Sequence, residues 1–297
     1  MVERSSTFLL KQMQSSEEKP YPSRSSSYKL DAVVGMGTFG LVWKATIVEG
    51  DYKDVTVAIK IIDLEQFEDM SLQEMKKEIV VMNTSNHKNI VDELISFISG
   101  NQLYIVMELL GAGSCLSIVK HFSSRNCPGI AEEAVIATIL RETMLGLQYL
   151  HKNNKIHRDI KCGNILLNMA GHVYLSDFGV SANIKKGMKR DTLVGSPCWM
   201  APEVMDEKGH DQKADIWSLG ITAIELALGD PPHSSYPPVK VIMMIINQDP
   251  PTLPSVAPPG ITWSPEFKAF IAACLQKNPV KRPTVDELFK EHAGFFA

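Results

Sequence analysis

Residues 157–179 read HRDIKCGNILLNMAGHVYLSDFG, and two carboxylates in this stretch determine how the whole chain is interpreted. The first, Asp159, has cations and an amide close by in the chain: Arg158, Lys161 and Asn164. The second, Asp177, follows a short apolar segment, 173–175, that is typical of a buried strand. A surface charge cluster is the ordinary explanation of the first group. A second acid at a strand end favours a functional site instead.

These side chains are suited to binding a divalent cation. Asp159, Asn164 and Asp177 all offer hard oxygen atoms, which Mg²⁺ prefers as ligands. Magnesium commonly binds few protein groups and completes its shell with water and substrate phosphates. The stretch therefore predicts a site for Mg²⁺ and a phosphate-bearing substrate.

A glycine-rich run upstream supports phosphate binding. Residues 35–42 read GMGTFGLV, and glycines let the backbone approach phosphate groups because they lack a Cβ atom. Alone the run is a weak signal, because a glycine-rich hairpin turn or a dinucleotide-binding loop has the same composition. A strand rather than a helix is expected after Gly40, which argues against the dinucleotide fold.

Lys60 ends the apolar segment VAIK at 57–60 and so lies inside an expected strand. A buried ammonium group without a partner is costly, which predicts a nearby anion, although a solvated lysine at a sheet edge is the ordinary alternative. A helix predicted at 71–82 from its capping box and apolar spacing offers Glu74 and Glu78. Glu74 belongs to the capping box, so Glu78 is the preferred partner.

The remaining pattern divides the chain in two. Five segments rich in β-branched residues predict strands: 28–34, 41–48, 55–62, 92–98 and 103–108. Beyond Gly113 the pattern becomes helical, with one apolar face along 136–150. Segment 215–228 is apolar almost all round, and a capping box at Thr284 begins a last helix. Residues 1–27, rich in Ser, Lys, Glu and Pro, predict a flexible tail.

Composition narrows the class of protein further. The 297 residues carry 30 Lys plus Arg and 34 Asp plus Glu, a net charge of -4, which disfavours a protein that coats nucleic acid. Five cysteines without a Cys-x-x-Cys pair favour a reducing, cytoplasmic location over a disulfide framework or a zinc site. The apolar runs fall far short of the roughly 20 residues of a membrane span, so neither membrane nor nucleic acid is expected as a partner.

With the sequence APE at 201–203, these motifs follow one another in the order found in eukaryotic protein kinases, and residues 28–289 resemble that family. The resemblance implies an α+β, bilobal protein-kinase fold. The N-lobe, 28–108, would be small and mostly β, and the hinge and larger, mostly α C-lobe would occupy 109–297. Two competing interpretations are a binding-only pseudokinase and a small-molecule phosphotransferase. The complete set of catalytic side chains disfavours the first, and the long segment before APE favours a polypeptide acceptor over the second.

The resemblance also implies a reaction and the residues that perform it. The chain is expected to transfer the γ-phosphoryl group of ATP, with Mg²⁺, to Ser or Thr hydroxyls of protein substrates. Asp159 would accept the hydroxyl proton, and Lys161 would neutralise charge on the moving phosphoryl group. Asn164 and Asp177 would bind the metal. Glu78 would steady Lys60, which would bind the phosphates. The implied nucleotide-binding residues are Val34, Gly35, Met36, Gly37, Gly40, Val42, Ala58, Lys60, Glu78, Met107, Glu108, Leu110, Asn164, Leu166 and Asp177.

Other matches to the family concern architecture. Asp215 would brace the catalytic loop from the apolar helix, and Glu203 would pair with Arg282. Cys115 is expected near the rim of the adenine pocket, where a reactive thiol is a hypothesis based on its position.

Three residues are implied to have regulatory roles. A phosphate on Thr192 would pair with Arg158 and order the segment from Asp177 to Glu203. Ser196 is a second regulatory candidate.

Runs at 137–142, 198–205 and 214–227 resemble the sterile-twenty, germinal-centre branch, closest to the Fray group of SPAK and oxidative-stress-responsive kinases. That resemblance implies stress or ion-transport signalling, an upstream activating kinase and an armadillo-like scaffold as partners. Two features depart from the group. Its C-terminal docking domain is missing from these 297 residues, through truncation or true absence, and Gly40 is intact where several members have another residue. A different germinal-centre branch is the alternative.

Overall fold

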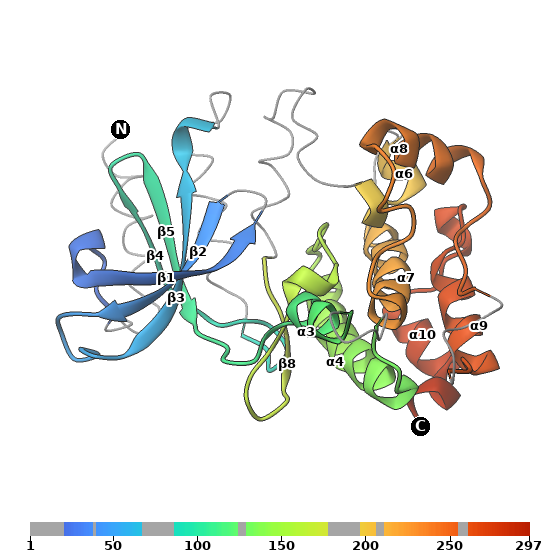
Figure 1. The fold of residues 1–297 in the computed structure, drawn as a ribbon, viewed down its shortest axis with the longest axis horizontal. Coiled ribbons are helices and arrows are strands. Elements are labelled where there is room, and N and C mark those ends of the chain that lie inside the picture. The colour runs from blue at the N-terminus through green and yellow to red at the C-terminus, as the bar shows by residue number, and fades with distance from the viewer. Residues whose placement is uncertain are drawn as a thin grey trace, which may run out of the picture. The chain divides into compact units, whose positions relative to one another are not determined.

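The computed structural model describes residues 21–37, 40–66, 86–123, 129–177, 197–205, 211–254 and 261–297. The chain divides into two compact units, of which the first combines Met1–Glu68 with Asp92–Leu109 and the second combines Asp69–Val91 with Leu110–Ala297. A sheet dominates the first unit and helices dominate the second (Figure 1), so the predicted α+β division is confirmed. The helix predicted at 71–82 lies outside the described residues.

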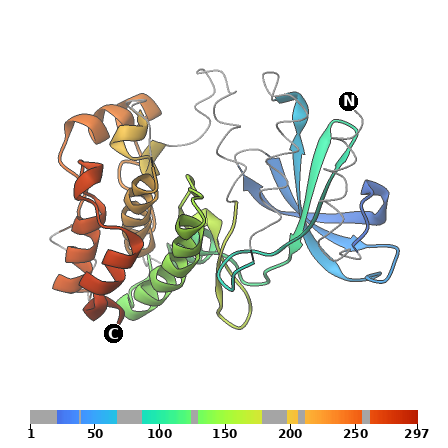
Figure 2. The same cartoon turned by 180° about the vertical axis from the view of Figure 1, so that it is seen from behind.

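The first unit is built on a five-stranded antiparallel sheet with the strand order β1-β2-β3-β5-β4. Its strands are β1 (Tyr28–Gly37), β2 (Gly40–Ile47), β3 (Thr56–Asp63), β4 (Glu93–Ser99) and β5 (Gln102–Glu108). Short 3₁₀ helices, η1 (Ser25–Ser27) and η2 (Leu64–Gln66), precede β1 and follow β3. All five predicted strands are confirmed. The hairpin of β4 and β5 lies at one edge (Figure 2), and its turn uses Gly100 at a φ of 60°.

The central strand β3 is buried on both faces. Side chains alternate along a strand, so Val57 and Ile59 lie on one face while Ala58 and Lys60 lie on the other. Val57 and Ile59 are at most 1% exposed, and they belong to the apolar cluster of this unit. Lys60 is only 2% exposed although it carries a charge. The solvated edge lysine considered from the sequence is therefore wrong, because β3 is an interior strand.

Residues 21–27 differ from the flexible tail that their composition predicts. The Tyr21 ring stacks on Tyr52 with ring centroids 4.3 Å apart. Tyr28, at the start of β1, is 6% exposed and stacks on Phe97 of β4 at 6.0 Å. Aromatic rings bury much area per residue, and two of them offset the ordering entropy of a polar segment. The first unit therefore includes this segment as packed structure.

Gly40 sits where a side chain cannot be accommodated. Its φ is +156°, and an added Cβ atom would collide with the backbone carbonyl oxygen of Ile61. We expect Gly40→Ala to lower the free energy of unfolding by about 1–3 kcal/mol, because backbone atoms of a paired strand cannot move aside.

Gly50 provides the matched control for this prediction. Its φ is also positive, at +79°, but nothing lies within 4 Å of an added Cβ atom. Gly50→Ala is expected to cost only about 1 kcal/mol. Urea unfolding of both variants measures the difference, and equal losses would show that the collision at Ile61 does not occur.

The second unit is mostly helical. Its α-helices are α3 (Cys115–Ser123), α4 (Glu133–Lys152), α6 (Pro202–Met205), α7 (Lys213–Leu228), α8 (Pro238–Asn247), α9 (Pro265–Cys274) and α10 (Val285–Glu291). Short 3₁₀ helices are η3 (Cys162–Asn164), η4 (Pro197–Trp199), η5 (Pro279–Lys281) and η6 (Ala293–Phe296). A small antiparallel sheet of β6 (Gly113–Ser114), β7 (Ile165–Leu167) and β8 (Val173–Leu175) completes the unit.

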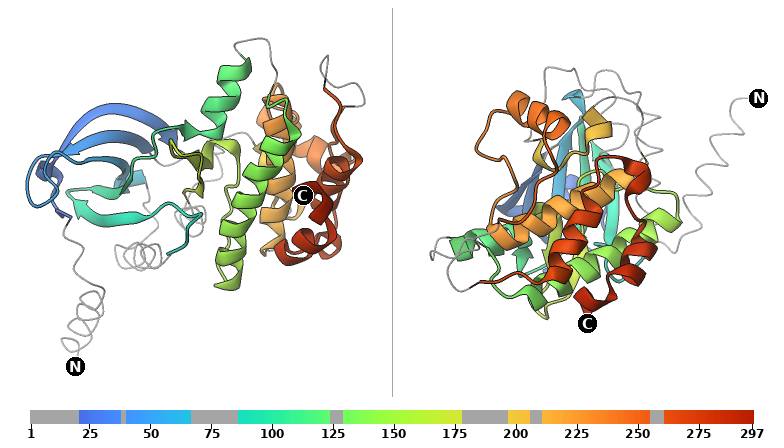
Figure 3. Two further views of the ribbon diagram at one scale, coloured as in Figure 1. Left: turned by 90° about the horizontal axis from the view of Figure 1, so that it is seen from below. Right: turned by 90° about the vertical axis from the view of Figure 1, so that its right-hand side faces the viewer.

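Helix α7 is the centre of this unit and lies between α4 and α9 (Figure 3). Every residue from Ala214 to Ala227 is buried, as the apolar pattern predicts. The predicted apolar face of α4 and the capping box at Thr284 are both confirmed. In the parts of the chain that the structure describes, we find no helix with the length and apolar character needed to cross a bilayer.

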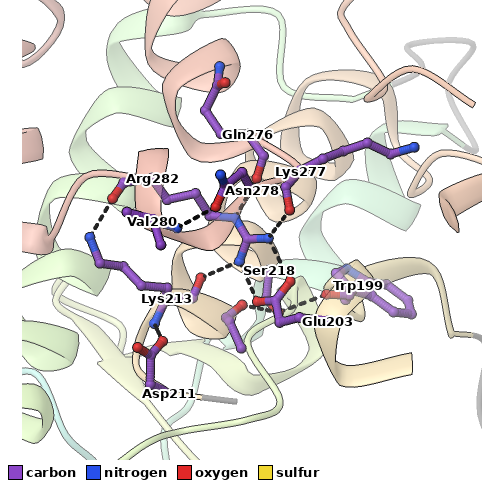
Figure 4. Close-up of polar contacts among 11 residues, drawn as sticks. Trp199, Glu203, Asp211, Lys213, Ser218, Gln276, Lys277, Asn278, Val280 and Arg282 are labelled. Carbon is purple, nitrogen blue, oxygen red and sulfur yellow. Dashed lines mark hydrogen bonds and ion pairs between the residues drawn. The ribbon is translucent and has the colours of Figure 1, made fainter. Parts of the chain in front are cut away.

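Arg282 ties the segment after α9 to the start of α6. Its guanidinium is 1% exposed and forms two bonds to the Glu203 carboxylate, of 2.6 and 2.7 Å. It also donates to the carbonyl oxygens of Lys213, Gln276 and Lys277 (Figure 4). The predicted pairing of Glu203 with Arg282 is confirmed.

Candidate active site

Helix α7 anchors the loop 157–164 through the buried carboxylate of Asp215. Asp215 has no exposed surface, and its Oδ2 accepts bonds from the His157 backbone N–H at 2.8 Å and from His151 Nε2 at 2.9 Å. Its Oδ1 accepts the Arg158 N–H at 2.7 Å. The predicted bracing role of Asp215 is confirmed. These bonds also help to hold Arg158 at a φ of +69°, a conformation that side-chain-bearing residues seldom adopt.

His157 links this loop to the end of β8. Its Nδ1 accepts the backbone N–H of Asp159 at 3.3 Å, so the neutral ring carries its proton on Nε2, which donates to the Ser176 carbonyl at 3.0 Å. Ser176 in turn donates its N–H to the carbonyl of Asn164 at 2.9 Å. The two stretches that the sequence singles out are therefore joined through backbone groups.

The Asp159 carboxylate is held by two neighbours. Lys161 Nζ donates to Oδ2 at 2.8 Å, and Asn164 Nδ2 donates to the same atom at 2.9 Å. Asn164 Nδ2 also donates to the Asp159 carbonyl at 2.7 Å. Both amide hydrogens of Asn164 are thereby used. The carboxylate keeps a fixed orientation while about a fifth of its side chain stays exposed.

Asp177 follows Ser176 directly and lies partly exposed at a φ of +62°. This left-handed conformation is rare for residues other than glycine, asparagine and aspartate. The charges of Asp159 and Asp177 both act on the pKa of His157, although less than its burial does. His157 therefore lies within electrostatic reach of both carboxylates.

The donor set fits the Mg²⁺ that the sequence predicts. With its N–H groups turned to Asp159, Asn164 has its amide oxygen left as a ligand. Asp177 supplies a carboxylate, and Mg²⁺ typically takes one or two such protein groups. Leu166 of β7, the other nucleotide-site residue predicted here, is half-buried and pairs with Tyr174 and Ser114.

Glu225 is a site residue that the sequence analysis missed. Its carboxylate is 1% exposed, and Oε2 accepts bonds from the Cys162 N–H at 3.0 Å and from the Trp199 indole Nε1 at 2.8 Å. The Cys162 thiol bonds the same carboxylate, while burial raises the pKa of Glu225 and that of the thiol. An acid inside the apolar part of the helix, ten residues after Asp215, was the available signal, equivalent to that of Lys60 in its strand.

One face of the sheet in the first unit carries five of the predicted nucleotide residues: Gly35, Val42, Ala58, Lys60 and Met107. Strand pairing aligns Gly35, Val42, Lys60 and Ile105 in one row, from β1 through β5. Ala58 and Met107 pair in the next row on the same face. Paired residues point to the same side of a sheet, so these side chains form one surface. The other predicted residues of the glycine-rich hairpin lie along the paired strands: Val34, Met36, Gly37 and Gly40.

The ends of the predicted hinge have defined backbone partners. The Glu108 N–H donates to the carbonyl of Asp92 at 3.4 Å. The Leu110 carbonyl accepts the Gly113 N–H at 3.2 Å. Three predicted site residues, Glu78, Thr192 and Ser196, lie outside the described residues.

The hypothesis of a reactive thiol at Cys115 is wrong. Cys115 begins α3 and has no exposed surface, since it packs in the apolar core of the second unit. Burial raises the pKa of this thiol to about 12. The thiolate is the nucleophilic form, so a buried thiol that ionises only in strong alkali is inert at neutral pH.

The buried His157 predicts loss of stability in acid. Burial lowers its pKa, and the charges of Asp215 and Asp159 oppose this effect only in part. Above the ordinary histidine pKa of about 6.5 the folded and unfolded chains both carry neutral His157. As the pH falls below that value, the unfolded chain binds a proton that the folded chain does not. The free energy of unfolding then falls by up to about 1.4 kcal/mol per pH unit.

Thermal unfolding between about pH 8 and about pH 5 tests this prediction when the wild type is compared with His157→Gln. Glutamine can donate to the Ser176 carbonyl but does not titrate. His87, whose pKa is also lowered mainly by burial, contributes equally to both proteins. The decline of Tm should be shallower in the variant, and equal slopes would contradict the assignment.

Comparison with known proteins agrees with this geometry. The family model of the protein kinase domain matches residues 28–293, so the chain belongs to the protein kinase family. The resemblance inferred from the motifs is thereby confirmed at the level of the family, together with its fold class.

Several curated relatives are kinases named for serine and threonine or for the germinal-centre group. The Dictyostelium discoideum protein "Serine/threonine-protein kinase fray2" is 44% identical over 279 residues, which are 93% of this chain and 26% of that protein. "Germinal center kinase 3" of Caenorhabditis elegans is 45% identical over 286 residues, 91% of this chain and 47% of that protein. "Serine/threonine-protein kinase sid1" of Schizosaccharomyces pombe is 42% identical over 273 residues, 91% and 54% respectively. The chain spans from about a quarter to about half of the length of these relatives.

Proposed function

We propose that this chain is a protein serine/threonine kinase that transfers the γ-phosphoryl group of ATP to hydroxyls of protein substrates. The observation that carries the proposal is the fixed carboxylate of Asp159, held by Lys161 and Asn164 on a loop anchored to α7. Phosphoryl transfer of this kind depends mostly on positioning and on charge stabilisation, which such an anchored loop provides.

Residues of the second unit have separate roles in catalysis and in metal binding in this proposal. Asp159 accepts the proton of the attacking hydroxyl, and its exposed part faces solvent where an acceptor can enter. Lys161, bonded to Asp159, stabilises negative charge as the phosphoryl group moves. Asn164 and Asp177 hold Mg²⁺, which when bound neutralises phosphate charge. The printed names of fray2 and sid1 support serine and threonine as acceptors.

Most of the proposed nucleotide-binding residues belong to the first unit, whereas Glu78 and Leu110 belong to the second. Lys60, buried in the row with Gly35 and Val42, binds the α- and β-phosphates and is steadied by Glu78. Ala58 and Met107 contact the adenine. The Leu110 N–H serves as a donor to the base, since its carbonyl is already bonded to Gly113.

Regulation by phosphorylation of Thr192 forms part of the proposal. The Arg158 Nε is buried and has no hydrogen-bond partner in the described part of the chain. A phosphate carries about −1.5 to −2 charge and would pair with this guanidinium. Ser196 is proposed as a second regulatory position.

The finer assignment rests on resemblance to the Fray group. Matches to proteins named fray2 and fray1 support it, whereas the equal match to sid1 leaves another germinal-centre branch as the alternative. Stress or ion-transport signalling, an upstream activating kinase, an armadillo-like scaffold and a cytoplasmic location belong to this proposal.

The proposal is tested by incubating the purified chain with Mg²⁺, γ-labelled ATP and myelin basic protein as the acceptor. The wild type should label serine and threonine residues, and Asp177→Ala should not. Equal labelling by both proteins would show that the activity does not arise at this site. No labelling by wild-type protein would favour a pseudokinase that only binds.

A further inference from the structure

We propose that Glu225 is a positioning residue which couples the segment ahead of α6 to the catalytic loop through Trp199. The inference rests on the proposed function, because it concerns the placement of Lys161 and Asn164 for phosphoryl transfer. Glu225 belongs to α7, Cys162 to the loop and Trp199 to η4, so three separate elements meet at one carboxylate.

The carboxylate depends on these donors for its place in the core. Glu225 is 1% exposed, and the charge of Lys161 lowers its pKa less than the hydrogen bonds from Cys162 and Trp199 do. A buried carboxylate is costly unless hydrogen bonds replace its water. Its Oε2 receives the Cys162 N–H and the Trp199 indole N–H, and the Cys162 thiol adds a further bond. Removing the Trp199 donor therefore leaves the Glu225 carboxylate less firmly positioned, and with it the Cys162 N–H that it binds.

One oxygen atom serves two segments that are far apart in the sequence. Oε2 accepts at 3.0 Å from the loop and at 2.8 Å from Trp199, so the position of one donor constrains the other. The Trp199 carbonyl is independently held by Ser218 Oγ of α7 at 2.7 Å. Loss of the indole bond would therefore leave the backbone of Trp199 anchored while freeing the carboxylate.

The loop end of this connection lies next to the catalytic groups. Cys162 is the residue after Lys161, and η3 runs from Cys162 to Asn164. Thr222 of α7 also lies near the loop, with its Oγ1 3.4 Å from the Ile160 carbonyl, but its hydroxyl hydrogen is used in the 2.7 Å bond to the Ser218 carbonyl. Glu225 is therefore the stronger support beside Lys161. The position of Trp199 therefore affects the positions of Lys161 and Asn164, which are proposed to bind the phosphoryl group and the metal.

The decisive variant is Trp199→Phe, which removes the indole N–H and keeps an aromatic ring. We expect kcat for phosphorylation of myelin basic protein to fall roughly tenfold to a hundredfold, as for loss of a hydrogen bond to a charged group. KM for ATP should stay within about twofold, because Lys60, Ala58 and Met107, the residues proposed to bind the phosphates and the adenine, belong to the first unit and keep their strand pairing. Thermal unfolding monitored in parallel separates loss of folded protein from loss of turnover.

Trp263 offers a matched control within the same unit. Its indole is 2% exposed and packs at 5.6 Å from Phe267, and its Nε1 has no hydrogen-bond partner in the described chain. Trp263→Phe therefore makes the same change in volume without removing a hydrogen bond. Its kcat should equal that of the wild type.

Two further variants test whether Trp199 acts on the catalytic loop through Glu225 or whether the two residues contribute independently. Glu225→Gln retains an amide oxygen that can accept both N–H bonds, so it should keep kcat within a few-fold of wild type. In Glu225→Leu the acceptor is gone, and adding Trp199→Phe to it should cause no further loss of kcat.

The outcomes separate this inference from the function on which it rests. Equal kcat values for Trp199→Phe and Trp263→Phe, or a full additional loss in the Glu225→Leu background, would overturn the coupling alone. Failure of the wild type to phosphorylate any acceptor would overturn the proposed function and, with it, this inference.

Discussion

Asp159→Asn should reduce kcat for phosphorylation of a protein acceptor by roughly 10²–10⁴-fold, the range for loss of a general base. The substitution is nearly isosteric. The new amide oxygen can still accept bonds from Lys161 and Asn164, which hold the native carboxylate at 2.8 and 2.9 Å. Folding should therefore survive, while the group can no longer take up the proton of the hydroxyl.

The companion measurements make this prediction specific. Mg-ATP affinity should change by less than about threefold, because the proposed metal ligands are Asn164 and Asp177. Asp211→Asn makes the same chemical change at an exposed position, where the carboxylate accepts the nearby Lys213 N–H at 2.8 Å, and it should leave kcat unaltered. A loss of kcat smaller than about tenfold in Asp159→Asn would contradict the role of Asp159 as the base.

Arg282→Met is expected to have the largest effect on stability, a loss of about 3–5 kcal/mol. The guanidinium is almost fully buried, bonds Glu203 through two oxygens and satisfies the carbonyls of Lys213, Gln276 and Lys277. It also lies 5.2 Å from the ring of Trp217. Methionine fills the volume but leaves these acceptors and the Glu203 charge without a partner.

Urea unfolding would measure this loss against the neighbouring Lys281→Met, an exposed position expected to change stability by less than about 0.5 kcal/mol. Most domains are stable by only about 5–15 kcal/mol, so Arg282→Met should be close to unfolding at body temperature. Adding Glu203→Gln should recover part of the loss, because the buried charge is then removed. Equal stabilities of Arg282→Met and Lys281→Met would show that the arginine contributes no net stability.

The sequence predicts those features that depend on local pattern or on short motifs. Side-chain period and β-branching place β1 to β5, and a box of Thr284 with Glu287 starts α10 as expected. The loop around Asp159 is predicted because its functional groups are close in the chain. Lys60 is predicted to be buried because a charge inside an apolar strand is unusual, and it is 2% exposed.

Features that depend on contacts between distant segments were not predictable in this way. The composition of 21–27 is that of a flexible segment, and only the meeting of Tyr21 with Tyr52 makes it packed structure. Cys115 was expected near a pocket rim, but its burial depends on how α3 packs in the core. The role of the Glu225 carboxylate was not predicted, because its donors, Cys162 and Trp199, come from distant parts of the chain.

The central claim is that the two carboxylates have separate tasks, with Asp177 gripping the cation of the nucleotide and Asp159 steering the acceptor hydroxyl. Calorimetric titration with ATP, in the presence and absence of Mg²⁺, tests it directly on the wild type, Asp159→Asn and Asp177→Ala. We expect Mg²⁺ to strengthen ATP binding to the wild type and to Asp159→Asn but not to Asp177→Ala. Metal-strengthened binding retained by Asp177→Ala, or lost by Asp159→Asn, would contradict it.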